Sequence, residues 1–118
     1  MDNIIIASPE QVERIRSQSD LGPSSLVLAM GEDLAVVKNL VEIDPVFYAN
    51  GATNSRKLMF VWGIENWLRL TSTWAYYFNV KAEDSVWRKV VETHGAEAIS
   101  EAPEIRYKKI LNPIKEGA

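Results

Sequence analysis

The 118-residue sequence contains no cysteine and a single histidine, His94. The absence of cysteine excludes disulfide bonds, zinc–thiolate sites and thiol catalysis within the chain. One histidine without cysteine leaves no constellation for zinc or haem, so we expect no metal and no cofactor. His94 itself is expected in the last turn of a helix, where a polar side chain suits the free carbonyls. Stability must therefore come from packing, and the lack of cysteine favours a reducing, cytoplasmic location.

Motifs for phosphate binding and for catalysis are also missing. The six glycines are scattered, and neither GxxxxGK[ST] nor GxGxxG occurs. No nucleophile-elbow pattern supports a Ser-His-Asp arrangement. The carboxylate pairs 32–33 and 83–84 fall where helix N-termini are expected, so capping explains them better than acid/base catalysis. We therefore predict no catalytic residues and a protein that is not an enzyme.

The sequence has no long uninterrupted apolar run and no basic excess. Its most apolar window, 57–80, is interrupted by Glu65, Asn66 and Arg69, which a lipid-spanning helix would rarely tolerate. The opening MDNIIIASPEQ has an acid at position 2 and no basic region, unlike a secretory signal. The net charge of −3 argues against a general nucleic-acid coat. We expect a soluble cytoplasmic protein with no membrane partner.

The residues that are present fit one globular domain. Nearly half are hydrophobic and a quarter are charged, which is ordinary globular composition. A chain of this length can bury a hydrophobic core without needing disulfide bonds or metal ions for stability. We predict a single domain over 1–118 with a mobile tail at 113–118.

Helical periodicity dominates the predicted elements. Ser8, Pro9 and Gln11 form a capping-box pattern that predicts a helix over 9–19. Apolar residues recur on one face over 32–43 and over 85–94, where Asp84 or Ser85 would cap the helix and Gly95 would end it. Pro103 followed by Glu104 predicts a last helix that ends near Asn112.

The stretch LRLTSTWAYYFNV, 68–80, fits two structures. Its alternating polarity and its Thr, Trp, Tyr and Phe residues are typical of a strand. On a helical wheel over 64–79, however, the apolar residues also gather on one half, and a 13-residue strand would be about twice the usual length of 5–6 residues. We favour the helix. The predicted fold class is mainly α, a compact bundle of about five helices; the alternative is α+β with an antiparallel hairpin or meander over 46–80.

One stripe of the predicted central helix carries residue types common in interfaces. Trp62, Arg69 and Tyr76 recur every seven residues, and Leu58 lies on the same stripe. Tryptophan, tyrosine and arginine are enriched in interaction hot spots. We predict a non-catalytic binding protein (an adaptor, inhibitor or assembly subunit) that contacts another protein chain, a second copy or a different protein, through this stripe. The stripe could instead be covered by the chain's own elements.

Two further interpretations stay open. A basic segment near the C-terminus, with two cations earlier in the chain, could contact nucleic acid as part of an accessory subunit of a nucleoprotein complex; its residues are Arg88, Lys89, Arg106, Tyr107, Lys108 and Lys109. An aromatic small-molecule or enzymatic pocket could be lined by Trp74, Tyr77, Trp87 and His94. We assign Trp67, Trp74 and Trp87 to the core.

Overall fold

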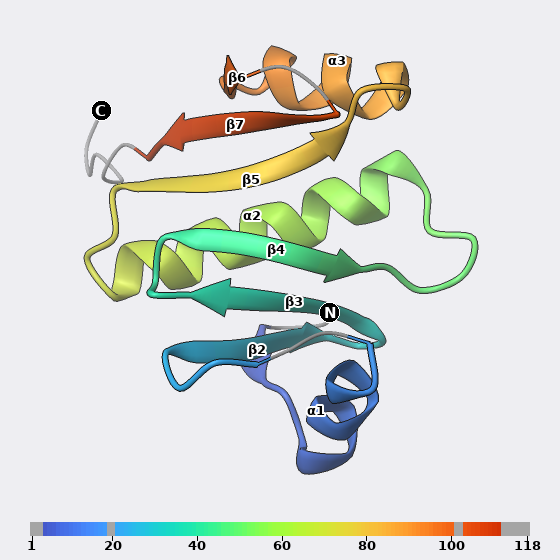
Figure 1. Ribbon diagram of the computed structural model, residues 1–118, viewed down its shortest axis with the longest axis vertical. Helices are drawn as coiled ribbons and strands as arrows, with labels where there is room; N and C mark the ends of the chain where they lie inside the picture. Colours follow the sequence, from blue (N-terminus) through green and yellow to red (C-terminus); the bar gives the residue numbers. More distant parts are fainter. Residues whose placement is uncertain (1–3, 19–20, 101–102, 112–118) are drawn as a thin grey trace, which may run out of the picture.

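A computed structural model describes residues 4–18, 21–100 and 103–111 (Figure 1). Along the chain the elements are β1 (Ile5–Ile6), α1 (Pro9–Arg16), β2 (Ser25–Met30), β3 (Asp33–Lys38), β4 (Glu42–Phe47), α2 (Asn54–Leu70), β5 (Ala75–Lys81), α3 (Ser85–Thr93), β6 (Glu97–Ser100) and β7 (Glu104–Ile110). The tail predicted to be mobile, 113–118, lies outside the described residues.

The strands form one mixed sheet of seven in the order β1-β2-β3-β4-β5-β7-β6. Every neighbouring pair is antiparallel except β4 and β5, which run parallel. The prediction of a mainly α bundle of five helices is therefore wrong. The alternative names the right class, α+β, but is wrong in its detail, because helix α2, Asn54–Leu70, occupies the middle of the range 46–80, where a hairpin or meander was predicted. No helix in the described part of the chain is long and apolar enough to cross a membrane.

The predicted helix over 32–43 is replaced by β3, a turn and β4. Asn39 and Leu40 both have positive φ, at 55° and 61°, and they turn the chain between the two strands. In β3 the residues Leu34 to Val37 are all buried, because the sheet is covered on both faces here. A strand buried on both faces loses the alternation of polarity that would distinguish it from a buried helix.

The ambiguous stretch 68–80 contains the end of a helix and then a strand. Helix α2 ends at Leu70, Ser72 adopts a φ of 61°, and β5 begins at Ala75. The helical interpretation is thus correct only as far as Leu70. In β5, Tyr76 and Val80 are buried and alternate with less buried residues, as expected for a strand with one covered face.

Of the three remaining local predictions, two are confirmed and one is wrong. The capping box at Ser8 is confirmed, because its hydroxyl accepts from the amide of Gln11 and its own amide donates to the Gln11 side chain. The helix over 85–94 is confirmed as α3, with Asp84 as its N-cap. The helix predicted from Pro103 is wrong, since strand β7 occupies 104–110.

Helix α1 covers one face of the sheet, and helices α2 and α3 cover the other. Helix α1 packs through Ile15 on one face of β2 and β3. Helix α2 packs through Phe60, Ile64 and Leu68 on the other face. Helix α3 continues this second layer, with Val91 packed beside residues of β5 and β7. Within the described ranges, the face opposite α2 and α3 therefore has no helix over β4, β5 and β7 (Figure 1).

Candidate functional site

The parallel strands β4 and β5 diverge soon after they meet. They are paired at a single position, Glu42 with Tyr77, next to a hydrogen bond of 2.8 Å from the Tyr77 amide to the Val41 carbonyl. Beyond this point the two strands separate toward their C-terminal ends, and α2 lies behind the gap (Figure 1). One edge of β4 is thus left without a strand partner in the middle of a sheet.

A cavity of about 450 Å³ occupies this gap, a volume typical of small-molecule sites. Its walls come from both diverging strands and from the helices behind them. The apolar part of the lining includes Ile43 and Val46 of β4, Leu58, Val61 and Ile64 of α2, Phe78 and Val80 of β5, and Trp87 and Val91 of α3. The lining also contains charged and polar side chains.

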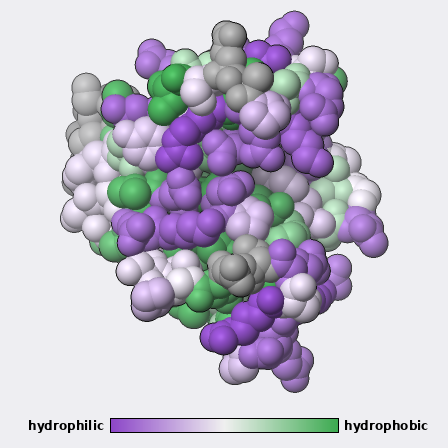
Figure 2. All heavy atoms as spheres, viewed as in Figure 1, coloured by the Kyte–Doolittle hydropathy of each residue, from purple (hydrophilic) through white to green (hydrophobic). Residues whose placement is uncertain are grey.

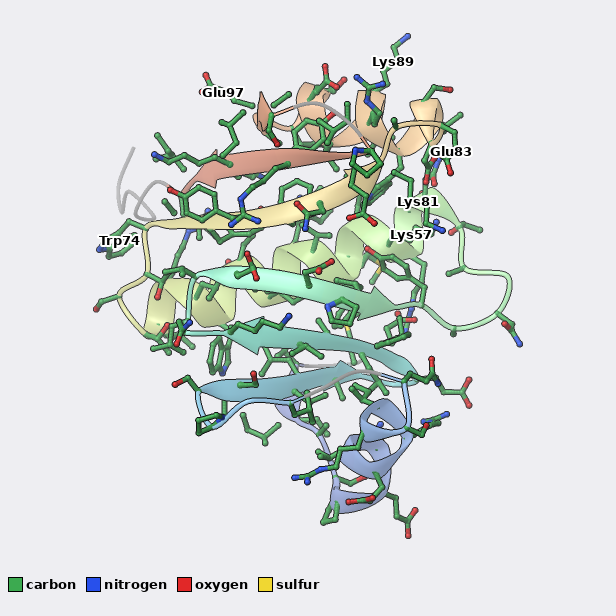
Figure 3. All side chains as sticks on the ribbon, in the orientation of Figure 1. Lys57, Trp74, Lys81, Glu83, Lys89 and Glu97 are labelled. Atoms are coloured by element: carbon green, nitrogen blue, oxygen red, sulfur yellow. The ribbon has the colours of Figure 1, made fainter. Side chains whose placement is uncertain are left out.

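Two lysines stand at the open end of the cavity. Lys57, in the first turn of α2, and Lys81, the last residue of β5, both line it. The Lys57 ammonium lies 5.1 Å from the ring centroid of Tyr48 and 5.6 Å from that of Trp87. Figure 3 shows Lys57 and Lys81 at the same end of the molecule, where the strands are farthest apart. Among the described residues neither lysine has a carboxylate within salt-bridge distance.

The start of α2 is fixed by a buried aspartate. Asp33 is fully buried, and its carboxylate accepts from the Ala49 amide at 2.7 Å and from Arg56 Nε at 3.0 Å. Gly51 turns the intervening loop with a φ of +76°, which favours glycine. Thr53 caps the helix through the Arg56 amide. The first-turn amides of α2 and the positive end of its dipole therefore lie beside the cavity mouth.

Asp44 is one of three acidic residues that line the cavity; the others are Asp84, the N-cap of α3, and Glu104 at the start of β7. Between β3 and β4, Ala35 pairs with Val46 and Val37 with Ile43, so β4 contains one extra residue at Asp44–Pro45. Such bulges redirect side chains and are common beside active sites. Burial raises the pKa of Asp44 above its ordinary 3.8; the nearby carboxylates of Glu104 and Glu42 raise it further, while Lys38 and a hydrogen bond from Asn79 oppose the shift.

A second charged group closes the other end of the cavity. Tyr76 and Lys109 both line it, and both contact the same oxygen of Glu65: the Tyr76 hydroxyl donates to Oε2 at 2.6 Å, and Lys109 Nζ lies 2.7 Å from it. Glu65 and Tyr76 are each 4% exposed. Burial and the Glu65 carboxylate raise the pKa of Tyr76 well above its usual value, so its hydroxyl stays protonated.

The open face of the sheet beside the gap is polar. Arg106 of β7 pairs with Glu42 of β4 at 2.8 Å and also lies over the ring of Tyr77, 5.0 Å from its centroid. Lys108 lies 5.9 Å from the same ring. Figure 2 shows hydrophilic side chains spread over this part of the surface. Asp44 is thus within the electrostatic reach of groups on the open face while it lines the cavity.

Comparison with solved structures relates this arrangement to one fold. The S18-alanine N-acetyltransferase that acts on a ribosomal protein in Escherichia coli superposes with a TM-score of 0.70 at 8% identity, over 100% of this chain and 99% of that one. A putative acyl-CoA N-acyltransferase from Klebsiella pneumoniae (TM-score 0.62, 15% identity) and Ard1 from Thermoplasma volcanium (0.62, 10%) each match over 95% of this chain and 99% of theirs. The chain has the N-acetyltransferase fold.

No protein-family model matches the sequence, and no characterised protein matches it in sequence. The structural matches nevertheless contradict the prediction of a non-catalytic binding protein that is not an enzyme, because two of these three structures, which match along almost the whole chain, are described as an N-acetyltransferase and a putative N-acyltransferase. The prediction of an all-α protein is also wrong, since the described residues form a mixed sheet with three helices.

The predicted partner-binding stripe is not assembled as one surface. Leu58 and Trp62 line the cavity, and Trp62 is 47% exposed with its ring 5.9 Å from that of His94. Arg69 lies near the end of α2, where it donates to the Asn66 side chain. Tyr76 belongs to β5 and is buried, because the helix ends before it. Leu58, Trp62 and Tyr76 thus all line the same cavity, but the four residues do not form the exposed helical stripe that the seven-residue spacing predicted.

The basic segment is also divided between environments. In β7, Arg106 and Lys108 lie on the open face, while Tyr107 is fully buried and Lys109 contacts Glu65. On α3, Lys89 is exposed, and Arg88 donates to the Tyr107 hydroxyl at 3.3 Å. A strand sends successive side chains to opposite faces, so these residues form no single basic surface.

Two of the four residues predicted to form an aromatic pocket line the cavity. Trp87 and His94 line the cavity, with His94 at the end of α3 as its C-cap. Tyr77 lies instead on the open face, and Trp74, expected in the core, is 44% exposed at the opposite end of the sheet (Figure 3). Trp67, also assigned to the core, packs against it while partly buried.

The polar residues of the cavity carried no recognisable signal in the sequence. Asp44 lies between Ile43 and Pro45, and Lys57 and Lys81 resemble ordinary surface lysines. Only the contacts between β4, β5 and α2 bring them to one site. The pair Asp44–Pro45 is the one local indication of the bulge, since proline within a strand often accompanies a bulge.

Proposed function

We propose that the protein transfers an acyl group from an acyl-coenzyme A thioester to an amine. The observation that carries the proposal is the cavity between the diverging strands β4 and β5, with cations at its mouth and a partly buried carboxylate, Asp44, within it. The N-acetyltransferase fold, shared with a putative acyl-CoA N-acyltransferase, supports this assignment of the donor.

The residues at the cavity fit such a donor. Coenzyme A is an anionic nucleotide joined to a long, amide-containing arm that ends in a thiol. The Lys57 and Lys81 ammonium groups and the N-terminal end of α2 offer positive charge for its phosphates. The unpaired edge of β4 offers main-chain partners for amides, as when a peptide adds to a sheet edge. The apolar walls suit the remaining methylene groups.

Asp44 is suited to act as general base. In the transfer, the amine nitrogen forms a bond to the thioester carbonyl carbon, the carbon–sulfur bond breaks, and the sulfur leaves with the electron pair. The amine proton must be accepted, and Asp44 stands between the cavity and the polar open face from which an amine could approach. A carboxylate with a raised pKa is the better proton acceptor.

We propose an amine as the acceptor and do not specify it further. Its nitrogen would reach Asp44 from the open face. The Escherichia coli neighbour acts on an alanine of a ribosomal protein, which makes protein amines a reasonable first class to test. The cytoplasm, where acyl-coenzyme A and such acceptors are both found, is the proposed location.

Asp44→Asn tests the proposal directly. Acetyl-coenzyme A is offered with a panel of amines (peptides with free α-amines, lysine and spermidine), and the released thiol is followed colorimetrically. Loss of a general base lowers rates by about 10²–10⁴-fold. We expect kcat to fall by at least about 100-fold while the Kd of acetyl-coenzyme A, measured by calorimetry, changes little.

Glu97→Gln is the matched control, because Glu97 is an exposed carboxylate of β6 outside the cavity. Its activity should equal that of the wild type. Unchanged turnover in Asp44→Asn would remove Asp44 from the chemistry. No binding of acetyl-coenzyme A by the wild type would remove the proposed function itself.

A further inference from the structure

The closed end of the cavity is ionic, although most of its walls are apolar. Tyr76 and Lys109 line this end and share the Glu65 Oε2 oxygen at 2.6 Å and 2.7 Å. The three residues come from three different elements: Tyr76 from β5, Lys109 from β7 and Glu65 from α2. The Lys109 side chain is 14% exposed and that of Glu65 is 5% exposed. We call these three residues the floor triad.

The floor triad lies at the far end of the cavity from the lysines at the mouth. Lys81 and Tyr76 are five residues apart along β5, which corresponds to about 17 Å in a strand. Tyr76 is also adjacent to Tyr77, where β4 and β5 are paired and the gap is closed. A ligand whose phosphates meet Lys57 and Lys81 therefore points its other end toward the floor triad.

The polar groups of the floor triad make contact with an apolar acyl chain unfavourable. An ammonium has three N–H donors, and in the described part of the chain Glu65 is the partner that Lys109 has within hydrogen-bonding distance. The other donors can be satisfied by water in the cavity. A methylene chain that reached the floor would displace this water and leave buried N–H groups unpaired, which is costly.

We propose that the floor triad restricts the donor to short acyl groups of about two or three carbons, because longer apolar chains would have to cover the Lys109 ammonium. This inference rests on the proposed function and names the acyl class at the same site. Glu65, Tyr76 and Lys109 act as specificity-determining residues and take no part in bond making.

Binding constants test the inference without knowledge of the acceptor. Calorimetry measures the Kd of free coenzyme A, acetyl-coenzyme A and hexanoyl-coenzyme A for the wild type and for Glu65→Leu/Tyr76→Phe/Lys109→Met. For the wild type we expect the hexanoyl donor to bind at least about tenfold more weakly than the acetyl donor. The triple variant should abolish or reverse this difference, since added methylenes gain about 0.8 kcal/mol each when they are buried in an apolar site.

Free coenzyme A is the internal control, because it has no acyl group to reach the floor, and its Kd should be the same for both proteins. Apolar replacement of a whole buried ionic group is often tolerated. If the triple variant fails to fold by circular dichroism, Glu65→Gln/Lys109→Met keeps a hydrogen bond for Tyr76 and should shift the ratio in the same direction.

The two proposals fail differently. Equal affinity of the wild type for both donors, or an unchanged ratio in a folded variant, would overturn the role of the floor triad and leave the proposed function standing. No binding of any coenzyme A species would overturn the proposed function and the inference together.

Discussion

At the scale of single residues, Asp44 shows a conflict between stability and chemistry. Burial in the gap between β4 and β5 disfavours its charged form, and the carboxylates of Glu104 and Glu42 add to this effect. The bulge at Asp44–Pro45 keeps the side chain in the gap. A residue held where its charge is disfavoured is a common feature of functional sites.

The pH dependence of stability should reveal this conflict. The folded-state pKa of Asp44 is raised above 3.8, so its favourable contribution is complete below that pH and is lost as the pH rises through the folded pKa. Asp44→Asn should therefore melt higher than the wild type at pH 7, by about 1–3 °C, because Asp44 is only partly buried. The difference should shrink as the pH falls toward 3.8.

Thermal unfolding by circular dichroism at several pH values measures this difference, with Glu97→Gln as an exposed control that should follow the wild type throughout. A lower melting temperature for Asp44→Asn at pH 7 would show that the carboxylate stabilises the fold, contrary to our interpretation.

At the scale of elements, the Asp33 carboxylate determines where α2 starts. It joins the first residue of β3 to the loop before α2, through the Ala49 amide, and to the first turn of α2, through Arg56. Arg56 also donates to the Met30 carbonyl at 3.2 Å, which adds the end of β2. The cavity mouth therefore depends on an ion pair that lies outside the cavity.

Asp33→Ala should destabilise the fold and loosen this mouth. Removal of the fully buried Asp33 carboxylate leaves the Ala49 amide without its acceptor and takes one charged partner from Arg56, so we expect the free energy of unfolding to fall by about 2–4 kcal/mol. Urea denaturation measures the change. Glu32→Ala, at the exposed neighbouring carboxylate, should stay within about 0.5 kcal/mol of the wild type. Equal effects of the two substitutions would contradict the role given to Asp33.

Elements with local signals could be predicted from the sequence, and those defined by long-range contacts could not. Helices α1 and α3 carry capping residues, Ser8 and Asp84, that act within a few residues of themselves. Strands β3 and β7 lack such signals: β3 is buried on both faces, and Pro103 before β7 imitates a helix start. The sequence thus predicted helices where only the pairing of distant strands establishes a sheet.

The candidate site was still less predictable than the fold. Trp87 and His94 were named as members of an aromatic pocket, and both line the cavity. The charged residues of the cavity were missed or given other roles, as with Lys109, because their meaning depends on the divergence of β4 and β5. Nothing near Asp44 in the sequence indicates that the neighbouring strand turns away from it.

At the scale of the whole molecule, the placement of the helices gives the gap two different sides. Helices α2 and α3 back the cavity, while none of the described helices lies over the open face of β4, β5 and β7 (Figure 1). In the proposed reaction, the donor would enter at the mouth near Lys57 and Lys81, and the acceptor would approach from the open face. Asp44 lies where the two routes meet.

The most direct test of this account is an NMR titration of the ¹⁵N-labelled protein with acetyl-coenzyme A. We predict that the amide signals that shift belong to the edge of β4 at 43–47, the facing residues 78–81 and the start of α2 at 54–57, with Trp74 at the opposite end unaffected. Lys57→Gln/Lys81→Gln should weaken the apparent affinity by about tenfold or more, and Lys89→Gln, at an exposed lysine of α3, should leave it unchanged. Absence of shifts at millimolar ligand, or shifts confined to surfaces away from the gap, would contradict the assignment of this cavity as an acyl-donor site.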